Sequence, residues 1–134
     1  MTDTSGKTAE KLDTELLSLE ILSEISRIAH STLELKERLN AIVNTTAVKM
    51  GVDCCYVSLL EKDGKSLTLK AARGLDTNSI DKVMLNVGEG INGWVAKEMT
   101  PVALSDAHAD PRFKYIAETG EEKYRSMLAV PITV

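Results

Sequence analysis

Apolar side chains recur at α-helical spacing along residues 12–30, and they do so on two faces of the helix. One face is the side we expect to pack on the domain, and it consists of Leu17, Ile21, Leu22, Ile25, Ile28 and Ala29. Leu12, Leu16 and Leu19 fall on nearly the opposite face. Because a docked helix needs only one apolar face, the second face predicts contact with the same helix of another copy. Scattered surface leucines are the alternative explanation.

The pattern predicts the first helix over about residues 17–30 and a second helix over about residues 32–50. Because residues 1–12 are mostly polar, we expect them to form a flexible N-terminus. Ser31-Thr32-Leu33-Glu34 matches the capping box, in which a hydroxyl and a carboxylate satisfy two backbone donors. A regular apolar face follows, made of Leu35, Leu39, Ile42, Val43, Thr46 and Met50. Gly51 stands where such a helix is expected to end.

After Gly51 the apolar spacing changes to two, which predicts strands. Residues 54–61 form the first candidate strand. In the second candidate strand, Leu67, Leu69 and Ala71 alternate with Thr68, Lys70 and Ala72. Asp63-Gly64 lies between the two strands and favours a tight turn, so we expect an antiparallel hairpin. The remaining elements are expected to be short strands at residues 83–87, 101–105 and 126–134, a short helix at 91–99, and an irregular or helical stretch at 106–123.

These elements predict an α+β domain with a mainly antiparallel sheet and the two N-terminal helices on one face. The stretch G-E-G-I-N-G at residues 88–93 has the G-x-G-x-x-G spacing of a dinucleotide-binding turn, and Asp106 lies where a ribose-binding acid would be expected. However, the helix between them is too short for a parallel crossover, and a hairpin precedes the glycines. We therefore predict that the glycines form a turn where a helix and a strand pack closely, without a cofactor.

Composition and charge exclude several classes of partner. The chain has 134 residues, enough for one domain with one core. A net charge of −4 and only five aromatic residues offer little to a nucleic acid. No apolar run approaches the roughly 20 residues that span a bilayer, and the N-terminus lacks a secretory apolar core. We therefore predict a cytoplasmic domain without a membrane or direct nucleic-acid partner.

The only two cysteines, Cys54 and Cys55, are adjacent in the sequence. In a strand their side chains point to opposite faces, which disfavours a shared metal site or a relaxed disulfide. We interpret both as thiols of the core.

Two stretches in the second half of the chain closely resemble GAF domains. They are L-N-V-G-E-G-I-N-G-W-V-A-K-E-M-T-P-V-A-L-S-D-A-H-A-D-P-R-F and E-E-K-Y-R-S-M-L-A-V-P-I, and the match extends back through V-D-C-C-Y-V-S-L-L-E and A-A-R-G-L. Within the family, the chain resembles the N-terminal GAF domains of nitrogen-branch phosphotransferase enzyme I and of nitrogen-fixation transcription activators. The resemblance implies a GAF domain over residues 13–134, with a short-helix and loop lid over the sheet face opposite the N-terminal helices. GAF domains normally continue past V-P-I, so we expect this one to be incomplete at its C-terminus.

The resemblance implies a regulatory sensor that binds a small polar metabolite and couples it, through helix packing, to an attached signalling or transcription-control output. The alternative is a GAF module that only dimerises. GAF-fold methionine sulfoxide reductases and bilin-binding GAF domains use cysteines near the cavity, in a region that corresponds to about residues 84–118. This region contains no Cys here. We therefore predict no enzymatic activity and no cofactor.

The resemblance places residues 88–126 over the ligand cavity, and the polar and aromatic side chains of this segment are our candidate ligand-binding residues. They are Asn92, Trp94, Asp106, His108, Phe113, Arg125 and Ser126. Each also has a simpler structural role: Trp94 and Phe113 suit a core, Asp106 and Arg125 an ion pair, and Asn92 a helix cap.

The run Asp106-Ala107-His108-Ala109-Asp110 has the ligand types of a metal site. Metal sites usually gather ligands from several elements, and both aspartates suit turn caps, so we predict no bound metal. Arg125 and the free N–H groups at residues 90–92 favour an anion. Together with the resemblance, this suggests an amino acid or a 2-oxo acid as ligand, and we expect a homodimer through the first helix.

Overall fold

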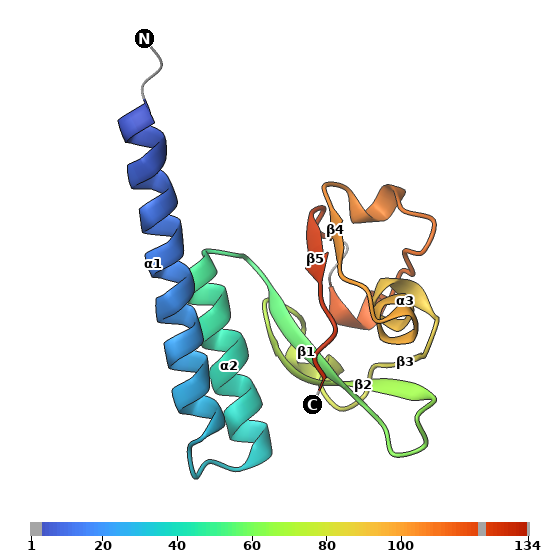
Figure 1. Ribbon diagram of the computed structural model, residues 1–134. Coiled ribbons are helices and arrows are strands. Elements are labelled where there is room, and N and C mark those ends of the chain that lie inside the picture. The colour runs from blue at the N-terminus through green and yellow to red at the C-terminus, as the bar shows by residue number, and fades with distance from the viewer. Residues whose placement is uncertain (1–3, 121–122, 134) are drawn as a thin grey trace.

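The computed structural model describes residues 4–120 and 123–133, and its elements are arranged in layers (Figure 1). In chain order they are α1 (Thr4–Ala29), α2 (Leu35–Met50), β1 (Cys55–Leu60), β2 (Ser66–Arg73), β3 (Met84–Asn86), α3 (Gly90–Glu98), β4 (Val102–Leu104) and β5 (Met127–Ala129). Helix α2 packs on β1 and β2, whereas α3 lies on the other side of these strands. This arrangement confirms the predicted α+β fold. None of the described helices has both the length and the apolar character that a membrane crossing requires.

Helix α1 differs from the prediction in where it begins and in what it covers. It begins at Thr4, well before residue 17, because the early residues include good helix formers such as Ala, Lys and Glu. It packs against α2 rather than against the strands, and its N-terminal half extends beyond α2 (Figure 1). The predicted domain-facing side is narrower than expected, since Ile28 is 4% exposed but Leu22 is 64% exposed. Leu22 lies about 100° around the helix from Ile21 and so points away from α2.

The connection between α1 and α2 does not use the predicted capping box. The N-cap residue of α2 is Glu34, and its side chain makes no capping hydrogen bond. The Ser31 hydroxyl instead donates to the carbonyl oxygen of Ile28 at 2.6 Å, so Ser31 closes the end of α1. The predicted end of α2 is confirmed, because Gly51 adopts a φ of +65° and its N–H reaches the last turn of the helix.

The hairpin at Asp63-Gly64 is confirmed, and β1 pairs with β2 in antiparallel orientation. A β-bulge separates the pairs Val57–Ala71 and Ser58–Leu69, which leaves Lys70 as an extra residue on β2. The bulge places Ala71 on the face opposite to Leu69. The prediction that Leu67, Leu69 and Ala71 share a face is therefore wrong.

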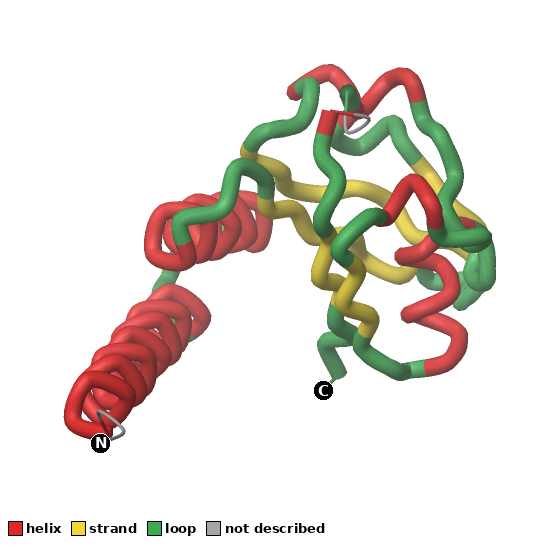
Figure 2. Tube along the Cα trace, turned by 90° about the horizontal axis from the view of Figure 1, so that it is seen from above, coloured by secondary structure: helices red, strands yellow, loops and turns green. Residues whose placement is uncertain are grey.

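The described strands form two antiparallel sheets, β1-β2-β3 and β4-β5, rather than one. In Figure 2, the two long helices α1 and α2 lie on one side of the strands, and α3 lies on the other. Around α3 is a compact apolar cluster, whose buried members are Ile91, Val95, Val102, Ala107 and Ala129. Strand β5 ends at Ala129 and is shorter than the predicted strand at residues 126–134. The space between the β1-β2-β3 sheet and α3 holds the candidate site.

Candidate functional site

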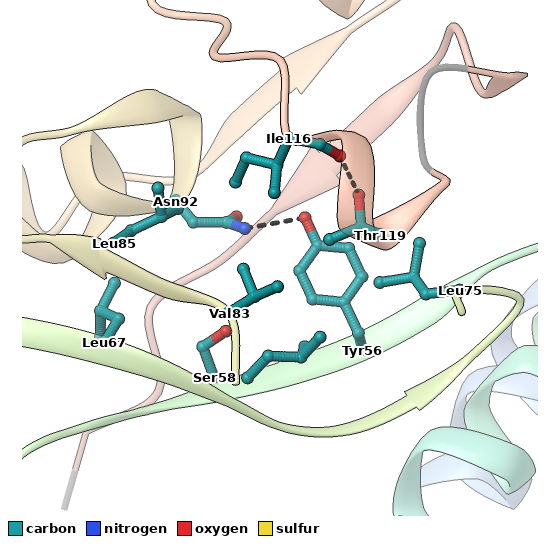
Figure 3. A pocket seen from close by; sticks show the side chains of 10 residues that line it. Tyr56, Ser58, Leu67, Leu75, Val83, Leu85, Asn92, Ile116 and Thr119 are labelled. Carbon is teal, nitrogen blue, oxygen red and sulfur yellow. Dashed lines mark hydrogen bonds between the residues drawn. The ribbon is translucent and has the colours of Figure 1, made fainter. Parts of the chain in front are cut away.

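A small pocket lies between the β1-β2-β3 sheet and the covering segment, residues 113–119 (Figure 3). Its cavity measures about 30 Å³, which is room for a water molecule or two. Its walls come from both sheet and cover, and the lining residues are Tyr56, Ser58, Leu67, Leu69, Leu75, Val83, Leu85, Asn92, Ile116 and Thr119. Strand alternation brings Tyr56 and Ser58 to this face together with Leu67 and Leu69.

A second pocket of about 30 Å³ adjoins the first, and the two share Tyr56, Leu85, Asn92 and Ile116. The side-chain amide of Asn92 donates a hydrogen bond of 2.7 Å to the phenolic oxygen of Tyr56 (Figure 3). This bond joins β1 to the first turn of α3. The two side chains therefore form a wall between the pockets.

The first pocket is lined by apolar and uncharged polar side chains only, as far as the described residues go. Two hydrogen bonds hold the covering segment in place. Within the segment, the Thr119 hydroxyl donates to the Ile116 carbonyl oxygen at 2.9 Å. From the loop after β2, the Asp76 N–H donates to the Thr119 carbonyl oxygen at 2.9 Å. The second pocket adds one charged side chain, Lys114, whose ammonium lies 3.1 Å from a Glu89 carboxylate oxygen. The hydrogen bond from Lys114, with a further one from the Asn86 N–H, holds the pKa of Glu89 below its usual range.

The glycine turn at residues 88–93 positions α3 beside this pocket. Gly88 and Gly90 adopt φ values of +92° and +67°, which side-chain-bearing residues rarely tolerate. A Cβ atom on Gly93 would lie 2.5 Å from the carbonyl oxygen of Asn86, at the end of β3. These contacts confirm the predicted role of the glycines, a turn that allows a helix and a strand to pack closely.

Two of the seven predicted ligand-binding residues line the pockets. Asn92 lines both, and Phe113 lines the second. Trp94 packs against the apolar cluster around α3, and the guanidinium of Arg112 lies 4.4 Å from the centre of its ring. His108 stacks on Phe113 with ring centres 4.5 Å apart, and its Nε2 lies 3.0 Å from the Tyr124 carbonyl oxygen.

The remaining three predicted residues lie outside both pockets. The Asp106 carboxylate accepts a hydrogen bond from the His108 N–H at 3.1 Å, which caps a short 3-10 turn. The Arg125 side chain is 68% exposed and lies 3.6 Å from Asp106. Ser126 is also exposed. Asp106 and Arg125 thus form the ion pair that was the structural alternative to ligand binding.

The side chains of Asp106, His108 and Asp110 already have nearby hydrogen-bond partners. Both carboxylate oxygens of Asp110 accept hydrogen bonds of 2.8 Å from the Arg112 guanidinium. This pairing, with a further hydrogen bond from the Arg112 N–H, lowers the pKa of Asp110 from 3.8 to about 2. Within residues 4–120 and 123–133, no group of three His, Cys, Asp or Glu side chains is placed to hold a metal ion.

Our sequence reasoning missed most of the pocket, above all Tyr56, Ser58, Lys114 and Thr119. The predicted candidates all lie within residues 88–126, and residues 54–61 were predicted only as a strand with core cysteines. The signal for Tyr56 and Ser58 was present in the strand alternation, because both fall on the face opposite to the helix-packed Val57. Their hydroxyl groups, on the sheet face away from α2, could have identified both as candidate pocket residues.

The family model for the GAF domain matches residues 34–134. The chain belongs to the GAF family. This match confirms the resemblance seen in the sequence, and it covers all three elements that build the pocket walls: the sheet, α3 and the covering segment.

Relatives of the GAF domain include regulatory proteins. The chain is 38% identical over 111 residues to an Escherichia coli K12 protein named phosphoenolpyruvate-dependent phosphotransferase system, covering 83% of this chain and 15% of that protein. It is 30% identical over 128 residues to the Nif-specific regulatory protein of Herbaspirillum seropedicae, covering 90% of this chain and 23% of that one. The chain thus spans less than a quarter of either relative.

A similar solved structure is the GAF domain of a phosphoenolpyruvate-protein phosphotransferase from Coxiella burnetii. It superposes with a TM-score of 0.80 at 28% identity, over 89% of this chain and 71% of that one. This likeness confirms the GAF fold of the chain.

Proposed function

We propose that this GAF domain is a regulatory sensor that binds a small polar metabolite at the wall formed by Tyr56 and Asn92. One observation carries the proposal: hydrogen-bonding side chains from β1, α3 and the covering segment converge on one cavity, namely those of Tyr56, Asn92 and Thr119. A single bound molecule would contact all three parts of the fold. It would thereby change how α3 packs on the sheet, and helix packing would pass this change to an attached output. The relationship to a regulatory protein supports this role.

An amino acid or a 2-oxo acid is our first choice of ligand. Residues 90–92, in the first turn of α3, and Lys114 border the second pocket, and helix N-termini and ammonium groups favour a carboxylate. A ligand carboxylate would compete with Glu89 for Lys114. Arg125 does not suit this role, because it borders neither pocket and its guanidinium pairs with Asp106.

Titration calorimetry with glutamine, glutamate and 2-oxoglutarate tests the sensor function. We expect saturable heat with at least one of the three, weakened in Asn92→Ala and unchanged in Asn78→Ala, whose side chain is exposed and lies outside both pockets. A ligand at 100 times its dissociation constant should also stabilise the domain by about 2.7 kcal/mol. Flat titrations with all three compounds would count against the sensor function.

A dimerisation module is the second candidate function, and it is favoured by exposed leucines on α1. Leu12, Leu16 and Leu19 are 54%, 58% and 63% exposed. They lie on the side of α1 opposite to Ile21, Ile25 and Ile28, which approach α2. Such a stripe is typical of a helix that packs on another helix. We infer that the partner is α1 of a second copy, and sedimentation of leucine variants tests it.

A further inference from the structure

Asp81 is bonded through its backbone to the wall of the first pocket. Its N–H donates to the Leu69 carbonyl oxygen at 2.7 Å, and the Leu69 N–H donates to the Val83 carbonyl oxygen at 3.0 Å. Leu69 and Val83 both line that pocket (Figure 3). Asp81 itself lies outside the lining of both pockets, in the loop before β3. A displacement of this wall therefore reaches the Asp81 backbone directly.

The Asp81 side chain connects the same loop to helix α2. One carboxylate oxygen lies 3.6 Å from the ammonium of Lys36, in the first turn of α2, and the other lies 3.3 Å from the ammonium of Lys70. Lys70 is the extra residue of the β2 bulge, next to Leu69. Its ammonium also lies 4.0 Å from a carboxylate oxygen of Glu61, just after β1. Asp81 thus contacts the pocket wall through its backbone and the helix layer, α1 and α2, through its side chain.

The backbone of Asp81 is held in an uncommon conformation. Its φ is +67°, and among the other described residues only Met99 combines a side chain with a positive φ. The left-handed region is unfavourable for a residue with a Cβ atom, although Asp tolerates it better than most. The ion pair with Lys36 contributes little to stability, because the two side chains are 48% and 69% exposed. A strained turn held by weak contacts can adopt a second arrangement, in which Asp81 leaves the left-handed region and releases Lys36.

We propose that Asp81 couples the pocket to the helix layer. When the wall at Leu69 and Val83 moves, the turn at Asp81 changes conformation, its carboxylate separates from Lys36, and α2 shifts on the sheet. Because α1 packs on α2, the shift reaches the helix whose N-terminal half extends away from the domain. The proposal rests on the proposed sensor function, and it adds the route by which an occupied pocket affects the helices on the opposite face of the sheet.

Substitutions in the pocket lining test this coupling without a ligand. Val83→Ala alters the wall that is bonded to Asp81, whereas Ile116→Ala alters the same pocket from the covering segment. The backbone amide resonances of residues 36–42, in the first half of α2, can be followed by NMR. We expect Val83→Ala to shift them and Ile116→Ala to leave them unchanged. In Asp81→Asn the response to Val83→Ala should be lost, because Asn tolerates the same φ but lacks the charge that holds Lys36.

A second pair of variants tests the contact with Lys36. Lys36→Met should remove the response of α2 to Val83→Ala, as Asp81→Asn does. Lys49→Met makes the same change in the last turn of α2, where the lysine ammonium lies 3.9 Å from Glu20, and should leave the response intact. Equal responses to Val83→Ala in the parent, Asp81→Asn and Lys36→Met would overturn the proposal. A folded Val83→Ala variant without shifts in α2 would overturn it as well.

The outcomes separate this coupling from the proposed sensor function. If Val83→Ala does not fold, Val83→Ile displaces the same wall by an added methylene group, and the same resonances decide. Saturable binding in the calorimetry without a response of α2 rejects the coupling alone. A response of α2 together with flat titrations rejects the sensor function alone. If the titrations are flat and α2 does not respond, both proposals are wrong.

Discussion

The Tyr124 hydroxyl donates a hydrogen bond of 2.6 Å to the carbonyl oxygen of Gly74. This bond ties the chain just before β5 to the loop that follows β2. The Asp76 N–H makes a second tie, at 2.9 Å, to the Thr119 carbonyl oxygen. Two hydrogen bonds thus join the chain between α3 and β5 to the loop after β2. Because Gly74 accepts one of them, a change at Gly74 should affect the stability of the whole site.

Gly74→Ala should destabilise the domain strongly. Gly74 has a φ of +90°, and a Cβ atom there would collide with the Asp53 carbonyl oxygen and lie 3.0 Å from the Tyr124 hydroxyl. Backbone strain and overpacking together predict a loss of about 2–4 kcal/mol in the free energy of unfolding. Urea denaturation measures this. Gly51→Ala is the matched control, because its φ of +65° is similar but nothing lies within 4 Å of the added atom. It should cost only about 1 kcal/mol, and equal losses in the two variants would refute the steric explanation.

The stability of the domain should fall in acid partly through Asp110. Its folded-state pKa of about 2 lies below its ordinary value of 3.8, because Arg112 pairs with it. A carboxylate whose pKa is lowered by folding stabilises the fold above its unfolded pKa and loses this contribution as the pH falls toward its folded pKa. We therefore expect the parent to lose stability more steeply than Asp110→Asn between about pH 4 and pH 2.

Urea midpoints measured across this range test the Asp110 prediction. The fluorescence of Trp94, the only tryptophan of the chain, offers a second signal because the Arg112 guanidinium lies over its ring. Asp106→Asn is a useful control, since Asp106 is an exposed turn cap paired with Arg125. Parallel pH profiles for the parent and Asp110→Asn would contradict the prediction.

The elements that local sequence decides were predicted correctly. The Asp63-Gly64 hairpin and the Gly51 helix end depend on backbone conformations that these residues favour, so their neighbours matter little. Ser31 shows the limit. Its sequence context fits an N-cap, but the chain turns so soon after α1 that the hydroxyl is used by Ile28 instead. A choice between two nearby partners depends on tertiary geometry, which the local pattern does not contain.

The candidate site was predicted only in part, for a related reason. Asn92 was predicted because it belongs to the glycine-turn segment. Strand alternation places Tyr56 on the pocket face, but its contact with Asn92, 36 residues along the chain, is absent from the local pattern. The bulge at Lys70 also changes which β2 residues face the pocket. Nothing in the alternation of residues 66–73 marks the position of that extra residue. Contacts between distant segments thus determine which residues line the pocket, whereas the conformational preferences of single residues determine where the turns form.

Cys55 should react slowly with alkylating reagents in the folded protein. Burial raises the pKa of its thiol, so less thiolate is present near pH 8 than for an ordinary cysteine. In Cys54→Ser, which leaves Cys55 as the only thiol, we expect iodoacetamide to react several times more slowly in buffer than in urea. Cys55→Ser reports on Cys54 in the same assay. Both cysteines are half-buried rather than fully buried in the core as predicted. Equal rates in buffer and urea would contradict the partial protection of the Cys55 thiol.

Substituting leucines on α1 should abolish any self-association without unfolding the domain. Leu12 and Leu16 are exposed and lie in the half of α1 that extends beyond α2, so glutamate at both positions removes an apolar stripe but no described core contact. We expect the parent to sediment as a concentration-dependent dimer and Leu12→Glu, Leu16→Glu as a monomer. Leu128→Glu changes a leucine of β5 that is 62% exposed, away from α1, and should sediment like the parent. Circular dichroism should show the helical signal retained in both variants. A parent that is monomeric at all concentrations, or a double variant of unchanged mass, would show that these leucines are surface residues without a partner in this chain.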